Sequence, residues 1–85
     1  MFTNKAPDGR NNCCGIVIMQ RRKELGKSQR QLADLLQIAG LDIDKNAVQR
    51  IEAGQRFVTD IELTFFASVL GISYDALLGS PQQEN

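Results

Sequence analysis

The chain has 85 residues, 42% of them hydrophobic, and so it suits one small domain with one modest core. Its ten basic and ten acidic side chains give a formal net charge of zero, which by itself argues against nucleic acid because DNA-binding domains are usually basic. No apolar run approaches the roughly 20 residues of a membrane span, and residues 1–5 do not lead into the apolar region of a signal peptide. We therefore expect a soluble, cytoplasmic protein without a membrane partner.

The two ends of the chain differ from its middle. Residues 1–11 carry turn formers and no periodic apolar face, and residues 80–85 are similarly polar, so we expect flexible tails around a domain at 12–79. Between the tails, turn signals divide the chain into helix-length pieces, with no alternating strand pattern. This organisation predicts an all-α fold, a compact bundle of five short helices.

Cys13 and Cys14 are adjacent, at the start of the first expected helix. Neighbouring cysteines rarely bridge because the vicinal geometry is strained, and two thiols without any histidine do not complete a four-ligand zinc site in one chain. We interpret them as small apolar residues rather than as a redox or metal site. No metal and no cofactor are expected.

The first two helices are marked by stop and start signals. The first helix is expected to start near Asn12 and to stop at Gly26, and its shared face carries Ile18, Arg22 and Leu25. The second begins at Ser28, which forms a capping box with Gln31, and ends at Gly40. Its expected buried residues are Leu32, Leu35 and Leu36.

Three more helices follow in the same way. The third takes Asp44 as its N-cap, stops at Gly54 and buries Ala47, Val48 and Ile51. Thr59 and Glu62 form a capping box that opens the fourth helix, whose inward residues are Leu63, Phe66, Ala67 and Leu70. Ser73 caps a short fifth helix that runs through Leu77 and Leu78.

Charge is distributed unevenly along this series of helices. Residues 15–58 hold eight basic and five acidic side chains, whereas the chain from Thr59 onward holds four acidic and no basic ones. A basic half can face phosphates while an acidic half faces away from them. The zero net charge therefore does not exclude nucleic acid.

Four segments resemble the Cro and phage-repressor (Xre-type) helix-turn-helix family, and together they span roughly residues 15–79. They are 26–29 (GKSQ), 31–33 (QLA), 51–54 (IEAG) and 70–78 (LGISYDALL). Any one of them is a weak signal, but four in the right order are specific. The resemblance implies that the second helix lies across the DNA backbone while the third, residues 45–53, enters the major groove.

The resemblance also assigns contacts to individual residues. Four positions of the third helix are expected to face base edges, namely Lys45, Asn46, Gln49 and Arg50. Their chemistry suits that role independently, because lysine and arginine donate to guanine O6 and N7 while the amides pair with adenine. The phosphate contacts are assigned to Lys27, Gln29, Arg30 and Arg56. The alternative for the third helix is an ordinary solvated face, which the neighbouring helix and the charge distribution disfavour.

Arg22 and Glu52 match two positions that form an ion pair between the first and third helices in this group. We expect them to pair, and a phosphate contact by Arg22 is the alternative. The chain also departs from the compact motif, because Ala33 and Val48 lie fifteen positions apart and the intervening turn is longer. Since residues 37–43 are largely apolar, we expect an extended second helix followed by an ordered turn.

A second departure lies in the first helix. Ile16, Val17 and Met19 occupy positions that are usually charged, and Arg21 replaces a usual core aliphatic. An apolar outer face indicates either a partner or oligomer surface or a shifted helix register, and both interpretations stay open.

These features together predict a small transcription regulator of prokaryotic or phage type, a repressor that binds a double-stranded DNA operator as a homodimer. One domain of this size makes too few contacts for strong specific binding. Ile72 and Tyr74 are candidates for the dimer surface, whereas Leu77 is assigned to the core. The alternative is a protein-interaction module that has lost DNA binding. No enzyme is expected, because nothing resembles a nucleophile with its base or a paired-carboxylate cleft.

Overall fold

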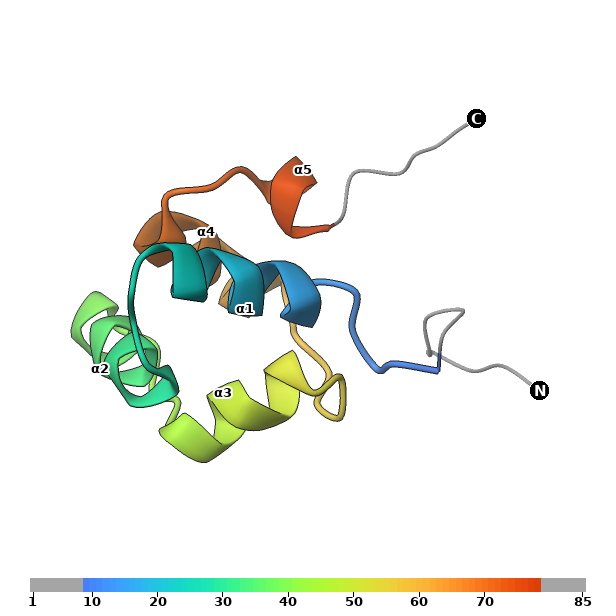
Figure 1. The fold of residues 1–85 in the computed structure, drawn as a ribbon, viewed down its shortest axis with the longest axis horizontal. Helices are drawn as coiled ribbons and strands as arrows, with labels where there is room; N and C mark the ends of the chain where they lie inside the picture. Colours follow the sequence, from blue (N-terminus) through green and yellow to red (C-terminus); the bar gives the residue numbers. More distant parts are fainter. Residues whose placement is uncertain (1–8, 79–85) are drawn as a thin grey trace.

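The computed structural model describes residues 9–78, which form five helices and no strand (Figure 1). The helices are α1 (Gly15–Glu24), α2 (Gln29–Ala39), α3 (Lys45–Glu52), α4 (Asp60–Leu70) and α5 (Tyr74–Leu77). The prediction of an all-α fold with five helices is therefore confirmed. In Figure 1, α3 and α5 lie at opposite edges of the bundle, with α1 between them. No helix within the described range is both long enough and apolar enough to cross a membrane.

Local capping interactions set where α2, α3, α4 and α5 begin. Ser28 Oγ accepts a hydrogen bond from the Gln31 backbone N–H at 3.0 Å, and Gln31 Oε1 accepts one from the Ser28 backbone N–H at 2.8 Å. Thr59 and Glu62 form the same reciprocal box at α4. Asp44 Oδ1 accepts a hydrogen bond from the Ala47 backbone N–H, which caps the start of α3. Each cap satisfies amides that have no partner inside the helix.

The start of α1 differs from the prediction. The helix begins at Gly15 rather than near Asn12, because Asn12 stays outside it and its Oδ1 accepts from the Gly15 backbone N–H at 2.9 Å. The helix ends at Glu24, so Leu25 lies beyond it and is 39% exposed instead of joining the buried face. Cys14 is buried, and that burial raises the pKa of its thiol to about 11. The cysteine therefore acts as a small apolar core residue.

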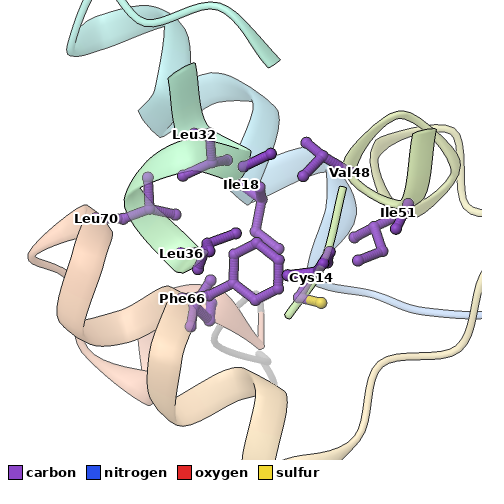
Figure 2. Packing of buried hydrophobic residues seen from close by; sticks show 12 residues of the cluster. Cys14, Ile18, Leu32, Leu36, Val48, Ile51, Phe66 and Leu70 are labelled. Carbon is purple, nitrogen blue, oxygen red and sulfur yellow. The ribbon is translucent and has the colours of Figure 1, made fainter. Parts of the chain in front are cut away.

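The core lies where all five helices meet. Its largest fully buried side chains are Ile18, Leu32, Leu36, Val48, Ile51, Phe66, Leu70 and Leu77. Figure 2 shows the Phe66 ring among side chains from α1 and α2. Leu35, which we expected on the buried face of α2, is instead 37% exposed. The assignment of Leu77 to the core is confirmed.

The unusual residues of α1 have separate structural explanations. Arg21 lies outside the core, and its Nε donates to the Leu70 carbonyl at 2.9 Å, which satisfies an otherwise unpaired group at the end of α4. Val17 packs against the core and Met19 is half-buried, so only Ile16 of these three apolar residues is exposed. The apolar outer face of α1 is therefore smaller than the sequence indicates.

The long connection between α2 and α3 is ordered. Gly40 ends α2 with a φ of 114°, a left-handed conformation that favours glycine. Ile43 is buried, and the Gln37 side chain donates to the Ile43 carbonyl at 2.9 Å. The Leu41 backbone N–H also donates back to Leu36, at 2.9 Å. An extended second helix followed by a packed turn is what the sequence predicts.

The predicted tails fall mostly outside the described residues, which exclude 1–8 and 79–85. Arg10 and Asn11, which we expected in the N-terminal tail, lie within the described residues and contact the end of α3. Arg10 Nη2 donates to the Glu52 carbonyl at 2.7 Å, and the Asn11 backbone N–H donates to the Gly54 carbonyl at 2.8 Å. Both residues are therefore held against the end of α3.

Candidate nucleic-acid interface

Helix α3 separates apolar from polar side chains along its length. Its inner face buries Ala47, Val48 and Ile51 against the core. The four residues assigned to base edges, Lys45, Asn46, Gln49 and Arg50, are all exposed. Burial of one face fixes the orientation of the helix, so the opposite face presents four long polar side chains together.

A shallow open hollow runs along this exposed face. It is lined by Asp44, Asn46, Gln49, Arg50, Ala53 and Gln55. Asp44 and Gln55 are additions to the set that the sequence indicated. Asp44 precedes α3 in the chain and Gln55 follows it, so no pattern within α3 itself points to them. The hollow brings together donors and acceptors that suit the edges of base pairs.

A second open hollow lies where α2 meets the start of α3. Its lining includes Arg30 and Lys45, with Asp34 and Gln37 of α2 and the capping residue Asp44. Arg30 and Lys27 are both exposed near the beginning of α2. Arg30 therefore lies beside the start of α3, where it can meet a DNA backbone that follows the groove.

Arg22 and Glu52 form a buried ion pair that joins α1 to α3. Arg22 Nε lies 2.7 Å from Glu52 Oε2, and Nη2 lies 3.0 Å from Oε1. The hydrogen bonds to Glu52 raise the pKa of Arg22. Arg22 Nη1 also donates to the Lys27 carbonyl at 2.8 Å. The expected pair is present, and the burial of the guanidinium leaves it facing away from solvent.

Gln29 connects this ion pair to α2. Its Nε2 donates to Glu52 Oε1 at 3.0 Å, so the amide links the beginning of α2 to the end of α3. A primary amide has two N–H donors, and the described residues occupy only one of them. The side chain therefore serves a structural contact that the sequence did not indicate, and it keeps a donor for a phosphate.

Arg56, which we expected to contact phosphate, forms an ion pair with Glu62 of α4. Its Nη1 and Nη2 bind Glu62 Oε1 and Oε2 at 3.1 and 2.9 Å. These hydrogen bonds raise the pKa of Arg56 and lower the pKa of Glu62. The guanidinium is directed towards Glu62 of α4, and a phosphate contact by its remaining N–H donors stays a prediction.

The two candidates for the dimer surface differ in exposure. Tyr74, the first residue of α5, is 52% exposed. Ile72 is half-buried and packs against the core. Tyr74 is therefore available for a partner, whereas much of the Ile72 side chain packs against the core. Leu78 adds a second exposed apolar side chain at the end of α5.

The interface contains no evident metal site. Within residues 9–78, no three His, Cys, Asp or Glu side chains gather in an arrangement suited to a metal ion. Besides the carboxylates of Asp34 and Asp44, the exposed groups near α3 are amides, guanidinium groups and an ammonium group. These are hydrogen-bond donors of the kind that bind base edges and phosphates.

Comparisons with known proteins agree with this geometry. The family model for Helix-turn-helix matches residues 18–77. A solved structure of the restriction-modification controller protein C.AhdI from Aeromonas hydrophila is 30% identical in sequence. The similarity covers 75% of this chain and 86% of the other, with a TM-score of 0.65. The search of curated proteins gave no match. The chain therefore belongs to the helix-turn-helix family and is a DNA-binding transcriptional regulator.

Proposed function

We propose that this protein binds double-stranded DNA sequence-specifically by placing α3 in the major groove. Lys45, Asn46, Gln49 and Arg50 contact base edges there. The observation that carries the proposal is the division of α3 into a buried apolar face and an exposed face on which these four residues lie together. Because the buried face packs against the rest of the bundle, the polar side chains are presented to DNA from a rigid support.

Phosphate contacts position the domain on the duplex. Lys27 and Arg30 are exposed around the beginning of α2 and supply positive charge, while Gln29 supplies the remaining N–H of its amide. Arg56 is the weakest member of the predicted set because Glu62 holds its guanidinium. The proposed backbone contacts therefore centre on the beginning of α2.

Homodimerisation supplies the second half-site. A single domain with one short recognition helix buries limited surface on DNA, and two copies related by a two-fold axis double the specific contacts. Exposed Tyr74 supports α5 as part of the dimer surface, with Ile72 contributing its exposed side. We propose that the dimer acts as a repressor by occupying its operator. The similarity to a restriction-modification controller supports a regulatory role.

Selection of binding sites from a random duplex library tests the base contacts. Binding to the selected duplex and to its single-base variants is then measured for Lys45→Ala, Asn46→Ala and Arg50→Ala. Each substitution is expected to cost about 1–3 kcal/mol and to relax discrimination at particular positions. Uniform losses on all duplexes would reassign these side chains to phosphates. Failure to enrich any duplex would favour the protein-interaction module, which the family match does not support.

No catalytic activity is proposed for this chain. The family and the fold are those of DNA-binding regulators. The described serine hydroxyls of Ser28 and Ser73 accept hydrogen bonds as helix caps. Capping accounts for both residues without a nucleophilic role.

A further inference from the structure

Arg10 binds the C-terminal end of α3 from a distant part of the chain. Its Nη2 donates to the carbonyl of Glu52, the last residue of α3, at 2.7 Å. A cation at this end of a helix satisfies an orphan carbonyl and opposes the negative end of the helix dipole. The side chain also lies against Gly54, where an added Cβ would come within 2.7 Å of Arg10 Cζ. Glycine therefore makes room for the guanidinium.

Asn12 connects the same end of α3 to the start of α1. Its Nδ2 donates to the carbonyl of Ile51 at 3.0 Å and to that of Arg56 at 2.7 Å, while its Oδ1 accepts from the Gly15 backbone N–H. An added Cβ on Gly15 would clash with Ile51 O and with the Asn12 side chain. The end of α3 and the start of α1 are thus in close contact, and the Asn12 side-chain amide is hydrogen-bonded to both.

Asn11 completes the contact just beyond the helix. Its backbone N–H donates to the Gly54 carbonyl at 2.8 Å, and its Nδ2 donates to the Gln55 carbonyl at 3.0 Å. Residues 10–12, which we name the N-terminal brace, therefore donate to carbonyls of Ile51, Glu52, Gly54, Gln55 and Arg56. Of these carbonyls, that of Ile51 also accepts a hydrogen bond from the Gly54 backbone N–H at 3.0 Å.

The brace holds the part of the interface that is least stable by itself. Helix α3 has 8 residues, and isolated helices of that length are marginal in water. Gln49 and Arg50 occupy its second half, and Gln55 follows in the same hollow. Fraying of the last turn would therefore move the side chains that face the bases, whereas the capped beginning of α3 would stay in place.

We propose that residues 10–12 are positioning residues for DNA reading, which hold the second half of α3 in the orientation that recognises the operator. This inference rests on the proposed function, because it assumes that α3 enters the groove. The brace acts through α3 and makes no base contact itself. A direct phosphate contact by Arg10 is the rival explanation, and the two differ in their effect on specificity and on salt dependence.

The test compares Arg10→Gln with Arg21→Gln. Arg21 is a matched control because its guanidinium also caps a helix carbonyl, that of Leu70 at the end of α4, and its substitution removes the same charge. Affinities are measured for the duplex selected from a random library and for an unselected duplex of equal length, at a temperature where circular dichroism shows both variants folded. Arg10→Lys is included because it keeps the charge but not the planar guanidinium.

The positioning role predicts that Arg10→Gln weakens binding to the selected duplex about tenfold, the scale of one charge-assisted hydrogen bond. Binding to the unselected duplex is expected to change less than about twofold, with the same salt dependence, since no phosphate contact is lost. Arg21→Gln is expected to leave the affinity ratio unchanged, and Arg10→Lys to restore part of it. Equal losses on both duplexes, with a salt slope reduced by about two because a homodimer would lose two phosphate contacts, would overturn the proposal in favour of a phosphate contact. An unchanged affinity ratio would overturn it as well.

Hydrogen exchange of the DNA-free protein separates this inference from the proposed function. Arg10→Gln is expected to accelerate amide exchange at Ala53, Gly54 and Gln55, which close the end of α3, and to leave the amides of α4 unchanged. Unchanged exchange at these three amides would refute the brace even if the protein binds DNA. If the wild-type protein selects no duplex, the proposed function fails and the reading role fails with it, whatever the exchange result.

Discussion

Replacement of Glu52 by alanine is the sharpest test of how α3 is held in the bundle. Glu52 is 6% exposed and Arg22 is 9% exposed, and the carboxylate accepts two hydrogen bonds from the guanidinium and one from Gln29. The substitution removes all three bonds at once. Arg22 keeps its bond to the Lys27 carbonyl, but its positive charge stays buried without a counter-ion.

Removing one partner of a buried ion pair costs about 3–5 kcal/mol, because the remaining charge is desolvated without compensation. In a domain of this size each kcal/mol lowers the thermal midpoint by about 4–8 °C, so Glu52→Ala is expected to lower it by at least about 12 °C. Thermal unfolding followed by circular dichroism measures the change. Glu24→Ala is the control, because its exposed pair with Arg21 contributes no more than about 1 kcal/mol.

The double substitution Arg22→Met/Glu52→Leu keeps this test informative even if Glu52→Ala does not fold. It removes both charges and leaves apolar side chains in their place, so its stability is expected to approach that of the wild type. The reasoning is refuted if Glu52→Ala is no more destabilising than Glu24→Ala, or if the double variant is less stable than the single one.

Three further predictions concern the cap of α4 and the two thiols. Thr59→Ala removes one half of the capping box and is expected to reduce the free energy of unfolding by about 1 kcal/mol, measured by urea denaturation. Hydrogen bonds with Arg56 hold the pKa of Glu62 below its ordinary value of 4.5, so its stabilising contribution is present above that pH and is lost as the pH falls through the folded-state pKa. Glu62→Gln should therefore be less stable than the wild type at neutral pH and show a shallower loss of stability in acid titrations. Iodoacetamide should modify exposed Cys13 in the native protein but leave Cys14 unmodified until unfolding, because Cys14 is buried with its pKa raised to about 11, and equal rates measured by mass spectrometry would contradict this.

Features that depend on neighbours in sequence could be predicted from the sequence. The caps at Ser28, Asp44 and Thr59 each use a backbone N–H three residues later, so a short pattern contains all the information needed. The exposed face of α3 follows from helical periodicity in the same way. For these elements, local chemistry and tertiary packing favour the same structure.

Features that depend on contacts between distant segments could not be predicted in this way. Arg10 and Glu52 are 42 positions apart, and no local pattern marks residue 10 as a cap for α3. Arg56 looks like an exposed cation in sequence, yet the turn into α4 directs it to Glu62. An arginine at position 21 is unexpected at a core position of the first helix, and only the hydrogen bond to the Leu70 carbonyl at the end of α4 explains it. Packing decides where each guanidinium points, and residue type alone does not.

The dependence of duplex affinity on salt tests the central claim most directly. Two cationic phosphate contacts per protomer, from Lys27 and Arg30, give four in a homodimer. At about 0.9 per phosphate, the logarithm of the binding constant for the selected duplex should fall with a slope of about −4 against the logarithm of salt concentration. Lys27→Ala/Arg30→Ala should reduce that slope towards zero while leaving the preferred sequence unchanged. A wild-type slope near zero, or no binding to any duplex at low salt, would contradict the assignment of this face to DNA.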